Sequence, residues 1–168
     1  MKIRTYRDGD EGAMSHIAPR AFMELGLARY AIDRELDRGR VADYYAREAN
    51  GYAERVRKGE AGIQIFLADV GDELAGYVVV AVDASNTEQF GVKWGRIVSL
   101  AVDPLHQSKG IGKSLVQRSL DWLQSQGVQY AEVLTDQNNI GAQRAYEANG
   151  FRAVYASISF SRWLEPTS

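Results

Sequence analysis

Two stretches in the second half of the chain carry residue types that could do chemistry together. In the first, the β-branched run 97–102 leads into a glycine turn, Gln107-Ser108-Lys109-Gly110-Ile111-Gly112-Lys113. The second begins at Asn139, contains Tyr146 and ends near Gly150. A strand, a glycine turn and a helix start leave backbone N–H groups free to hold an anion. The two stretches therefore predict a site for a pyrophosphate-bearing cofactor with proton chemistry beside it.

The glycine turn has the composition of an anion site. Gly110 and Gly112 carry no side chain that would block a phosphate, and Lys109 and Lys113 can add positive charge around it. The stretch 104–120 contains basic residues and no acid, although the whole chain is acidic. A plain strand-to-helix turn with solvated lysines explains the same residues equally well, so the turn alone does not decide the question.

Two nucleotide-binding motifs resemble this turn and fail on single positions. A P-loop needs a glycine five residues before Gly112, where this chain has Gln107. The dinucleotide fingerprint needs a third glycine at position 115, which is Leu115. A nucleotide-binding protein is therefore a disfavoured alternative.

The second stretch places an amide and a phenol on one helix face. Seven residues bring Tyr146 back over Asn139 to within about 20°. Ala142 lies between them and Ala145 is adjacent, so small residues form a shallow wall. Each polar residue also has a structural explanation: Asn139 as the helix N-cap and Tyr146 as a core tyrosine with a satisfied hydroxyl.

Composition excludes several classes of function. The chain has 168 residues, a net charge of −2 and a pI near 5.7, which gives no electrostatic footprint for nucleic acid or a membrane surface. It has no cysteine and two histidines, which excludes thiolate catalysis and multi-histidine metal sites, and we expect no metal. The longest apolar stretch, 77–82, cannot cross a bilayer, and no signal core is evident, so a cytoplasmic location is expected.

Hydrophobic periodicity and turn residues predict one domain over residues 1–168, without repeats or linkers. The expected order is a strand at 2–6, a helix at 11–25, one or two helices over 33–58 interrupted near Gly51, strands at 64–70 and 73–84, a loop at 85–94, a strand at 95–102, a helix at 110–126, a strand at 128–134, a helix at 139–149 and a strand at 151–163. Parallel pairing of 95–102 with 128–134 would place both chemical stretches just after the carboxyl ends of those strands, where ligands bind.

These residues resemble the GNAT superfamily of N-acetyltransferases. The pattern Gln107-x-x-Gly110-x-Gly112 is similar to the acetyl-CoA loop of that family, and Asn139-x-x-Ala142-x-x-x-Tyr146-x-x-x-Gly150-Phe151 is similar to its second motif. The resemblance is specific over 95–151 and otherwise rests on element order. It implies an α/β fold of mixed α+β type: a twisted mixed sheet of six to seven strands, splayed between two parallel strands and flanked by about four helices.

The resemblance also implies an activity and a set of site residues. The acetyl group of acetyl-CoA would move to a primary amine by direct attack. The cofactor would contact the backbone of Leu100, Ala101 and Val102, the N–H groups from Gln107 through Ser108, Lys109, Gly110, Ile111 and Gly112 to Lys113, and the side chain of Asn139. Tyr146 would bind the cofactor and protonate the departing thiolate, a role that suits a nearby acid. Homodimers are common in this family.

The sequence does not identify the amine acceptor or the base that would deprotonate it. The amine could be a small molecule or part of a peptide, and Tyr30, Tyr44, Tyr45 and Tyr52 could line its pocket or simply pack in helices. Glu24, Glu132 and Asp136 are candidate bases, and none is assigned. A non-catalytic acyl-CoA sensor is the main alternative to an enzyme, although a sensor needs no acid at position 146.

Overall fold

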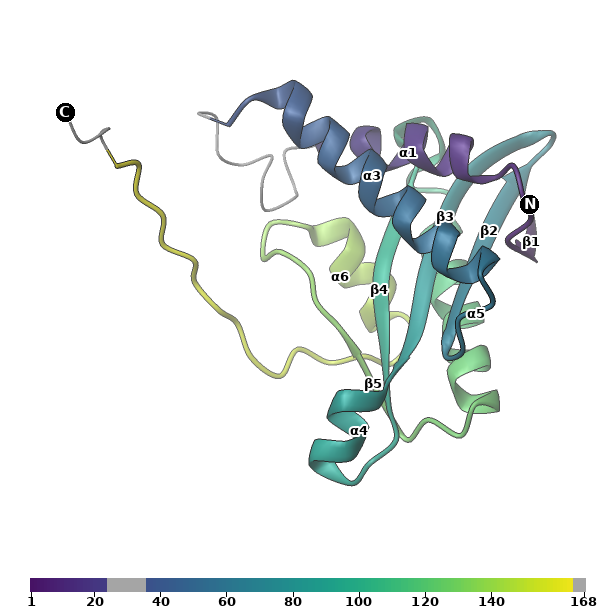
Figure 1. Cartoon of the computed structure of the whole chain (residues 1–168), viewed down its shortest axis with the longest axis vertical. Coiled ribbons are helices and arrows are strands. Elements are labelled where there is room, and N and C mark those ends of the chain that lie inside the picture. Colours follow the sequence, from purple (N-terminus) through teal and green to yellow (C-terminus); the bar gives the residue numbers. More distant parts are fainter. Residues whose placement is uncertain (24–35, 165–168) are drawn as a thin grey trace.

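The structure is a computed structural model of the chain and describes residues 1–23 and 36–164. Its strands form one sheet in sequential order (Figure 1), with β1 at Lys2–Thr5, β2 at Ile63–Val70, β3 at Glu73–Asp83, β4 at Trp94–Val102 and β5 at Tyr130–Val133. Neighbouring strands are antiparallel except for β4 and β5, which are parallel. The parallel pair predicted for the second half of the chain is therefore confirmed.

Helices cover both faces of the sheet (Figure 1). The described elements are α1 at Glu11–Met23, α3 at Arg38–Arg57, α4 at Ala84–Phe90, α5 at Ile111–Ser125 and α6 at Ile140–Glu147, with a short 3₁₀ turn, η1, at Pro104–His106. α1 and α3 pack on one face around Met14, Tyr45 and Tyr77. α5 and α6 pack on the other face around Phe66, Leu115 and Tyr146. The sheet therefore separates two hydrophobic cores, and each face can serve a different purpose.

Three parts of the expected architecture are wrong. The described sheet has five strands, not six to seven, because residues 151–163 form no strand and pair with no other segment there. Five described helices flank it rather than about four, because the loop expected at 85–94 contains α4. α3 also runs through Gly51 without a break.

α4 and α3 show why these expectations failed. α4 buries none of its residues, so it has no apolar stripe to reveal it; Asp83 caps its start by accepting from Asn86 N, and Gly91 ends it in a left-handed conformation. In α3 the buried residues Val41, Tyr45, Ala49 and Ala53 follow one another at intervals of four. This continuous buried face outweighs the cost of about 1 kcal/mol for a glycine inside a helix.

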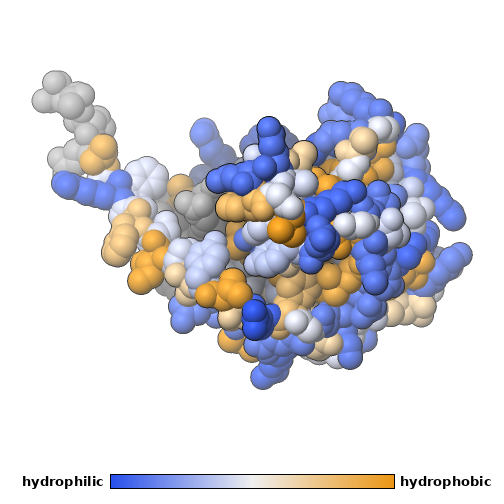
Figure 2. Space-filling model, turned by 90° about the horizontal axis from the view of Figure 1, so that it is seen from below, coloured by the Kyte–Doolittle hydropathy of each residue, from blue (hydrophilic) through white to orange (hydrophobic). Residues whose placement is uncertain are grey.

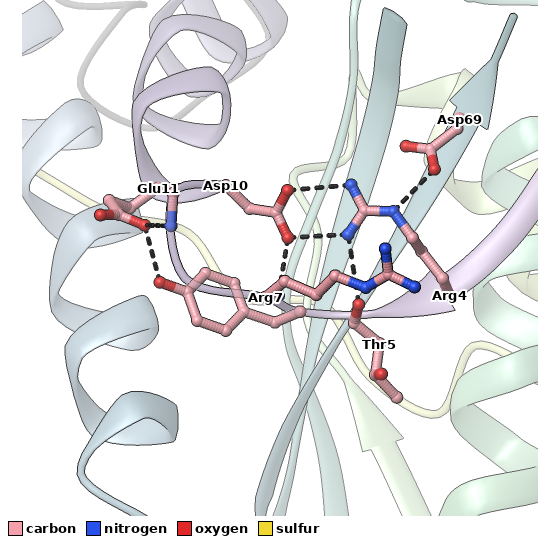
Figure 3. A network of polar contacts seen from close by, with 8 residues as sticks. Arg4, Thr5, Arg7, Asp10, Glu11 and Asp69 are labelled. Carbon is pink, nitrogen blue, oxygen red and sulfur yellow. Dashed lines mark hydrogen bonds and ion pairs between the residues drawn. The ribbon is translucent and has the colours of Figure 1, made fainter. Parts of the chain in front are cut away.

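A polar network fixes the angle between β1 and α1 (Figure 3). The Arg4 guanidinium donates to both carboxylate oxygens of Asp10 at 2.7 and 2.9 Å and to Asp69 at 2.7 Å. Tyr6 donates its hydroxyl to Glu11, the first residue of α1. Burial alone would raise the pKa of Asp10, but the bonds from Arg4 and from Arg7 N hold it below its usual range. α1 is thereby anchored to the edge of the sheet at its N-terminal end.

None of the helices in the described ranges is both long enough and apolar enough to span a membrane.

Candidate functional site

β4 changes its pairing halfway along its length. It pairs with β5 only from Trp94 to Ile97, whereas its pairing with β3 continues to Val102. The register with β3 skips Val98, which is a β-bulge at the point where β5 leaves. The two parallel strands therefore diverge beyond Ile97, as the expected splayed sheet requires.

The backbone of this unpaired stretch points into the opening. Asp103 N donates to Ala75 O of β3, and the direction of backbone groups alternates along a strand. The N–H and C=O groups of Leu100 and Val102 therefore face away from β3, toward the side from which β5 has departed. Their side chains pack with the α5–α6 core, whereas that of Ala101 is buried in the opposite core. The backbone of Leu100 and Val102 is thus placed to pair with an extended ligand.

The turn after β4 is held by its own side chains. Asp103 caps η1 by accepting from Leu105 N at 2.9 Å, and Gln107 donates its Nε2 to Val102 O at 3.2 Å. Gln107 N itself lies 3.4 Å from Pro104 O, so this N–H already has a partner. Two turn residues, Ser108 and Gly110, have positive φ angles of 61° and 77°. Glycine adopts such angles freely, but at Ser108 they cost of order 1 kcal/mol, a strain typical of ligand-binding loops.

The N-terminus of α5 is open. α3, α4 and α6 each begin with an Asp or Asn whose side chain caps the first turn, but the cap of α5 is Gly110, without a side-chain hydrogen bond. The first backbone bond of α5 runs from Ser114 N to Gly110 O. The N–H groups of Ile111, Gly112 and Lys113 therefore point out of the helix end, where the helix dipole favours an anion.

Gly112 brings three elements together. A Cβ placed on it would lie 3.8 Å from both Val102 Cγ2 in β4 and Ala145 Cβ in α6. Asn149 Nδ2 also donates to Lys113 O at 3.1 Å, which joins the end of α6 to the start of α5. The two predicted motifs therefore lie side by side at the opening of the sheet, as their order along the chain suggested.

The two lysines of the turn lie at its surface. Lys109 donates its Nζ to Leu105 O at 3.0 Å, which closes the turn, and Lys113 is exposed beside the open helix end. Neither side chain forms an ion pair within the described residues. Both are placed to add a screened positive charge beside the open end of α5.

α6 presents the two residues expected from the second motif in different settings. Asn139 caps the helix, its Oδ1 accepting from Ala142 N at 3.1 Å. A cofactor contact from Asn139 stays a prediction; its Nδ2 and the second lone pair of Oδ1 could serve it. Tyr146 is 8% exposed and packs edge-on against Phe151, with ring centroids 6.0 Å apart. Burial raises the pKa of Tyr146 to about 12, so the phenol keeps its proton at neutral pH and can donate it.

The opposite face of the sheet carries a polar cluster in which the sequence analysis named the tyrosines Tyr44 and Tyr52 but not Glu48. Glu48 of α3 lies within hydrogen-bond distance of the hydroxyls of Tyr44, at 3.4 Å, and Tyr52, at 3.3 Å. Burial and the charge of Glu48 raise the pKa of Tyr52. Tyr77 is buried below them and shares a hydrogen bond with Ser99, the residue after the bulge. The spacing of four between Tyr44, Glu48 and Tyr52 was the available signal, although core packing produces the same spacing.

Two of the candidate bases named from the sequence, Glu132 and Asp136, lie within the described residues and have structural partners there. Glu132 pairs with Arg96 at 2.8 Å, and this bridge spans β4 and β5 below the opening. Asp136 precedes α6, and its backbone carbonyl accepts from Asn139 N. Glu24 and Tyr30 lie outside the described residues. Within the ranges that the structure describes, no group of three or more His, Asp and Glu side chains converges to hold a metal ion.

An ion pair joins the two faces. Arg20 of α1 donates to Asp103 at 2.7 Å, and Asp103 is 6% exposed. The same carboxylate caps the turn that leads to Gly110. Breaking a buried pair of this kind leaves an uncompensated charge, so the contact ties α1 firmly to the glycine turn.

Known proteins resemble this chain in sequence and in fold. The model of the acetyltransferase (GNAT) family matches residues 25–151. The chain belongs to the GNAT family. The match contains β4, the glycine turn, α5 and α6, which are the elements around the candidate site.

Individual relatives refine the comparison. A mycothiol acetyltransferase of Sanguibacter keddieii is 27% identical over 168 residues, all of this chain but 49% of the relative, so the chain spans about half the length of that protein. The PaiA N-acetyltransferase of Thermoplasma acidophilum, solved with coenzyme A, has a TM-score of 0.70 at 18% identity, covering 93% of this chain and 92% of that one. AAC(6')-Iy, solved with a CoA–acetylneamine bisubstrate analogue, has a TM-score of 0.64 at 13% identity over 97% and 98% of the two chains. At these identities the solved structures support the fold.

Proposed function

We propose that this chain transfers the acetyl group of acetyl-CoA to a primary amine by direct attack of the amine on the thioester. The observation that carries the proposal is the open N-terminus of α5, set beside backbone groups of Leu100 and Val102 that β5 does not pair with. An anion-holding helix end next to a free strand edge suits a ligand with a pyrophosphate at one end and an extended arm at the other. GNAT proteins use such a ligand, acetyl-CoA.

Different groups of the chain would serve different parts of the reaction. N–H groups from Ile111 to Lys113 would hold the pyrophosphate, and the strand edge at Leu100 and Val102 would orient the arm. A backbone N–H of the same edge can stabilise negative charge that develops on a carbonyl oxygen in the opening. Acetyl-CoA supplies the activated acetyl group. Tyr146, neutral at physiological pH, would give its proton to the sulfur that leaves.

The acceptor would approach from the α1–α3 face. On this face Glu48 lies within hydrogen-bond distance of the hydroxyls of Tyr44 and Tyr52, and its charge acts on the buried Tyr77. A carboxylate with phenol neighbours can bind an ammonium group, and an alkyl amine with a pKa near 10 must also lose a proton before attack. We therefore propose Glu48 as the group that receives the acceptor amine.

The first test is cofactor binding. Acetyl-CoA at a hundred times its Kd should stabilise the fold by about 2.7 kcal/mol, measured as a rise in melting temperature, and ATP at the same concentration should not. A shift with ATP alone would overturn the cofactor assignment.

The second test is transfer. Thiol release from acetyl-CoA should depend on an added amine, measured with neamine, glucosamine and an alanine-terminated peptide; these cover the aminoglycoside, amino-sugar and peptide classes. Binding of acetyl-CoA without amine-dependent thiol release from any of them would favour the non-catalytic acyl-CoA sensor.

A further inference from the structure

A hollow of about 170 Å³ lies where the turn between β1 and α1 meets the second half of α3. Figure 1 shows the start of α1 and the end of α3 beside β1, on the side of the molecule away from residues 152–164. Seen from below, that side carries mostly hydrophilic side chains (Figure 2). A small polar ligand suits such a surface better than an apolar one. The lining residues of the hollow are Tyr6, Glu11, Asn50, Ala53, Glu54 and Arg57.

The hollow is separate from the proposed acceptor site. Its α3 residues, from Asn50 to Arg57, follow the spacing i, i+3, i+4 and i+7, so they share one side of the helix. At about 100° per residue, Glu48 lies roughly 170° around the helix from the middle of that side. A ligand in the hollow would therefore not contact the side of α3 that carries Glu48.

Glu11 is the carboxylate of the hollow that is available to a ligand. Tyr6 donates its hydroxyl to Glu11 Oε2 at 2.7 Å, and Gly9 N donates to the same oxygen at 2.9 Å (Figure 3). Both bonds end on one oxygen, which leaves Oε1 for a ligand. The bond from Tyr6 lowers the pKa of Glu11, and the bond from Gly9 N lowers it further, so the carboxylate is charged at neutral pH. The second carboxylate, Glu54, already pairs with Lys58 at 2.7 Å.

Arg57, the last residue of α3, is the positive group of the hollow. Within the described residues it forms neither a side-chain hydrogen bond nor an ion pair. Beyond the effect of Tyr6, the charge of Arg57 also lowers the pKa of Glu11, so the two groups lie near each other without direct contact. Asn50 accepts from Ser15 through its Oδ1 at 2.6 Å, which leaves its Nδ2 as a further donor.

Opposite charges that flank a hollow without touching suit a ligand that carries both charges itself. An ammonium group would pair with Glu11 Oε1. A carboxylate would accept two parallel bonds from the Arg57 guanidinium, a geometry that both groups favour, and a third from Asn50 Nδ2. Ala53 and the ring of Tyr6 supply an apolar part of the lining, which suits a small side chain. We propose that this hollow binds a small amino acid in its zwitterionic form. The proposal is independent of the enzymatic function.

The first experiment titrates the isotope-labelled full chain with L-alanine, L-serine and L-valine, without acetyl-CoA, and follows backbone amide signals by NMR. At least one amino acid should shift the signal of Gly9 in a saturable way, because Gly9 N bonds Glu11, and should leave Gly110 and Gly112 in place. L-Alaninamide lacks the carboxylate and N-acetyl-L-alanine lacks the ammonium group. Each should bind about tenfold more weakly than L-alanine or worse, because it loses one charged partner. Failure of all three amino acids to bind, or equal binding of either analogue, would overturn the proposal.

The second experiment repeats the titration with variants of the two charged groups. Arg57→Gln and Glu11→Gln should each raise the Kd of the amino acid about tenfold or more. Both should fold, because Arg57 has no partner to lose and Gln at position 11 keeps an oxygen acceptor for the two bonds made there. The matched controls are Arg55→Gln and Glu60→Gln, which remove the same charges from an exposed pair outside the hollow and should leave the Kd unchanged.

The same titration with Glu48→Gln separates this hollow from the proposed acceptor site. An amino acid is itself a primary amine and could bind as an acceptor. If Glu48→Gln weakens its binding and Arg57→Gln does not, the amino acid occupies the acceptor site and the proposal for the hollow is wrong. Weakening by Arg57→Gln and Glu11→Gln, with the amide of Gly9 shifted in the unmodified chain, would support it.

Discussion

The two faces of the sheet offer different kinds of polar group to a ligand: backbone groups on one face and side chains on the other. On the α5–α6 face, the proposed cofactor site consists of backbone groups: the strand edge at Leu100 and Val102 and the open helix end at Gly110. On the α1–α3 face, the polar groups are side chains, with Glu48 between Tyr44 and Tyr52. A site made of backbone groups requires glycine at fixed positions, and fixed glycines form a motif that can be recognised in the sequence. A side-chain site on a helix leaves only a spacing that ordinary packing shares.

The strongest test of this comparison is Tyr146, a side chain within the backbone site. Tyr146→Phe should keep the fold and the affinity for CoA but lower turnover about 100- to 10,000-fold, because it removes one proton donor and keeps the ring. Turnover with the best amine and CoA calorimetry on the same protein measure the two effects. Tyr130→Phe is the control and should keep full turnover. Full activity in Tyr146→Phe would make Tyr146 a packing residue.

The same residue predicts a pH dependence. Since burial raises the pKa of Tyr146 to about 12, its proton stays in place well above pH 8, and a loss of rate below about pH 10 cannot come from its ionisation. For stability, a raised pKa means that the contribution of the neutral phenol is complete below the unfolded pKa near 10 and is lost between about pH 10 and 12. Tyr146→Phe should therefore unfold at higher alkaline pH than the unmodified chain, followed by circular dichroism.

Gly112 tests whether the backbone must stay accessible. Its surroundings admit a Cβ, with the nearest carbons at 3.8 Å, so Gly112→Val should fold. The larger side chain should keep an anion from the N–H groups and weaken CoA binding about 10- to 100-fold, the cost of one charge-assisted hydrogen bond. Gly51→Val, inside α3 with nothing near its Cβ position, is the control. Equal CoA affinity in both variants would assign Gly112 to turn geometry alone.

Substitution of Glu48 tests the proposed acceptor site on the α1–α3 face. Glu48→Gln should raise the KM for the amine about tenfold, because the ammonium loses a charged partner, and should leave CoA affinity unchanged. Glu54→Gln on the same helix, which removes only a surface pair with Lys58, is the matched control. An unchanged KM in Glu48→Gln, with turnover intact, would place the acceptor elsewhere.

The lysines of the turn should give the smallest effect. Changing Lys109 and Lys113 together to Gln should weaken CoA binding about two- to fivefold, because both charges are exposed and screened. It should also flatten the dependence of CoA affinity on salt, measured by titration at several ionic strengths. A salt slope equal to that of the unmodified chain would return both lysines to the solvated surface.

The sequence predicted the backbone site better than the rest. The β4 strand, the glycine turn, the start of α5 and the parallel partner β5 were expected within a few residues, because glycines and β-branched residues act locally. The strain at Ser108 was not expected, since no residue type announces it. Glu48 was missed because a helix spacing of four also describes core packing. Alternation over 151–163 gave the capacity to form a strand, but a strand also needs a partner edge.

The contact between Arg20 and Asp103 has a consequence for ligand binding on both faces. It links α1 to the glycine turn, because the Asp103 carboxylate accepts from Arg20 of α1 and also caps η1. A ligand that tightens the turn therefore also restricts α1, and a ligand that settles against α1 restricts the turn. Such coupling is reciprocal: the factor by which acetyl-CoA changes affinity for the amine equals the factor by which the amine changes affinity for acetyl-CoA. Under the proposed function, Asp103 is the residue through which the binding of one substrate would change the affinity for the other.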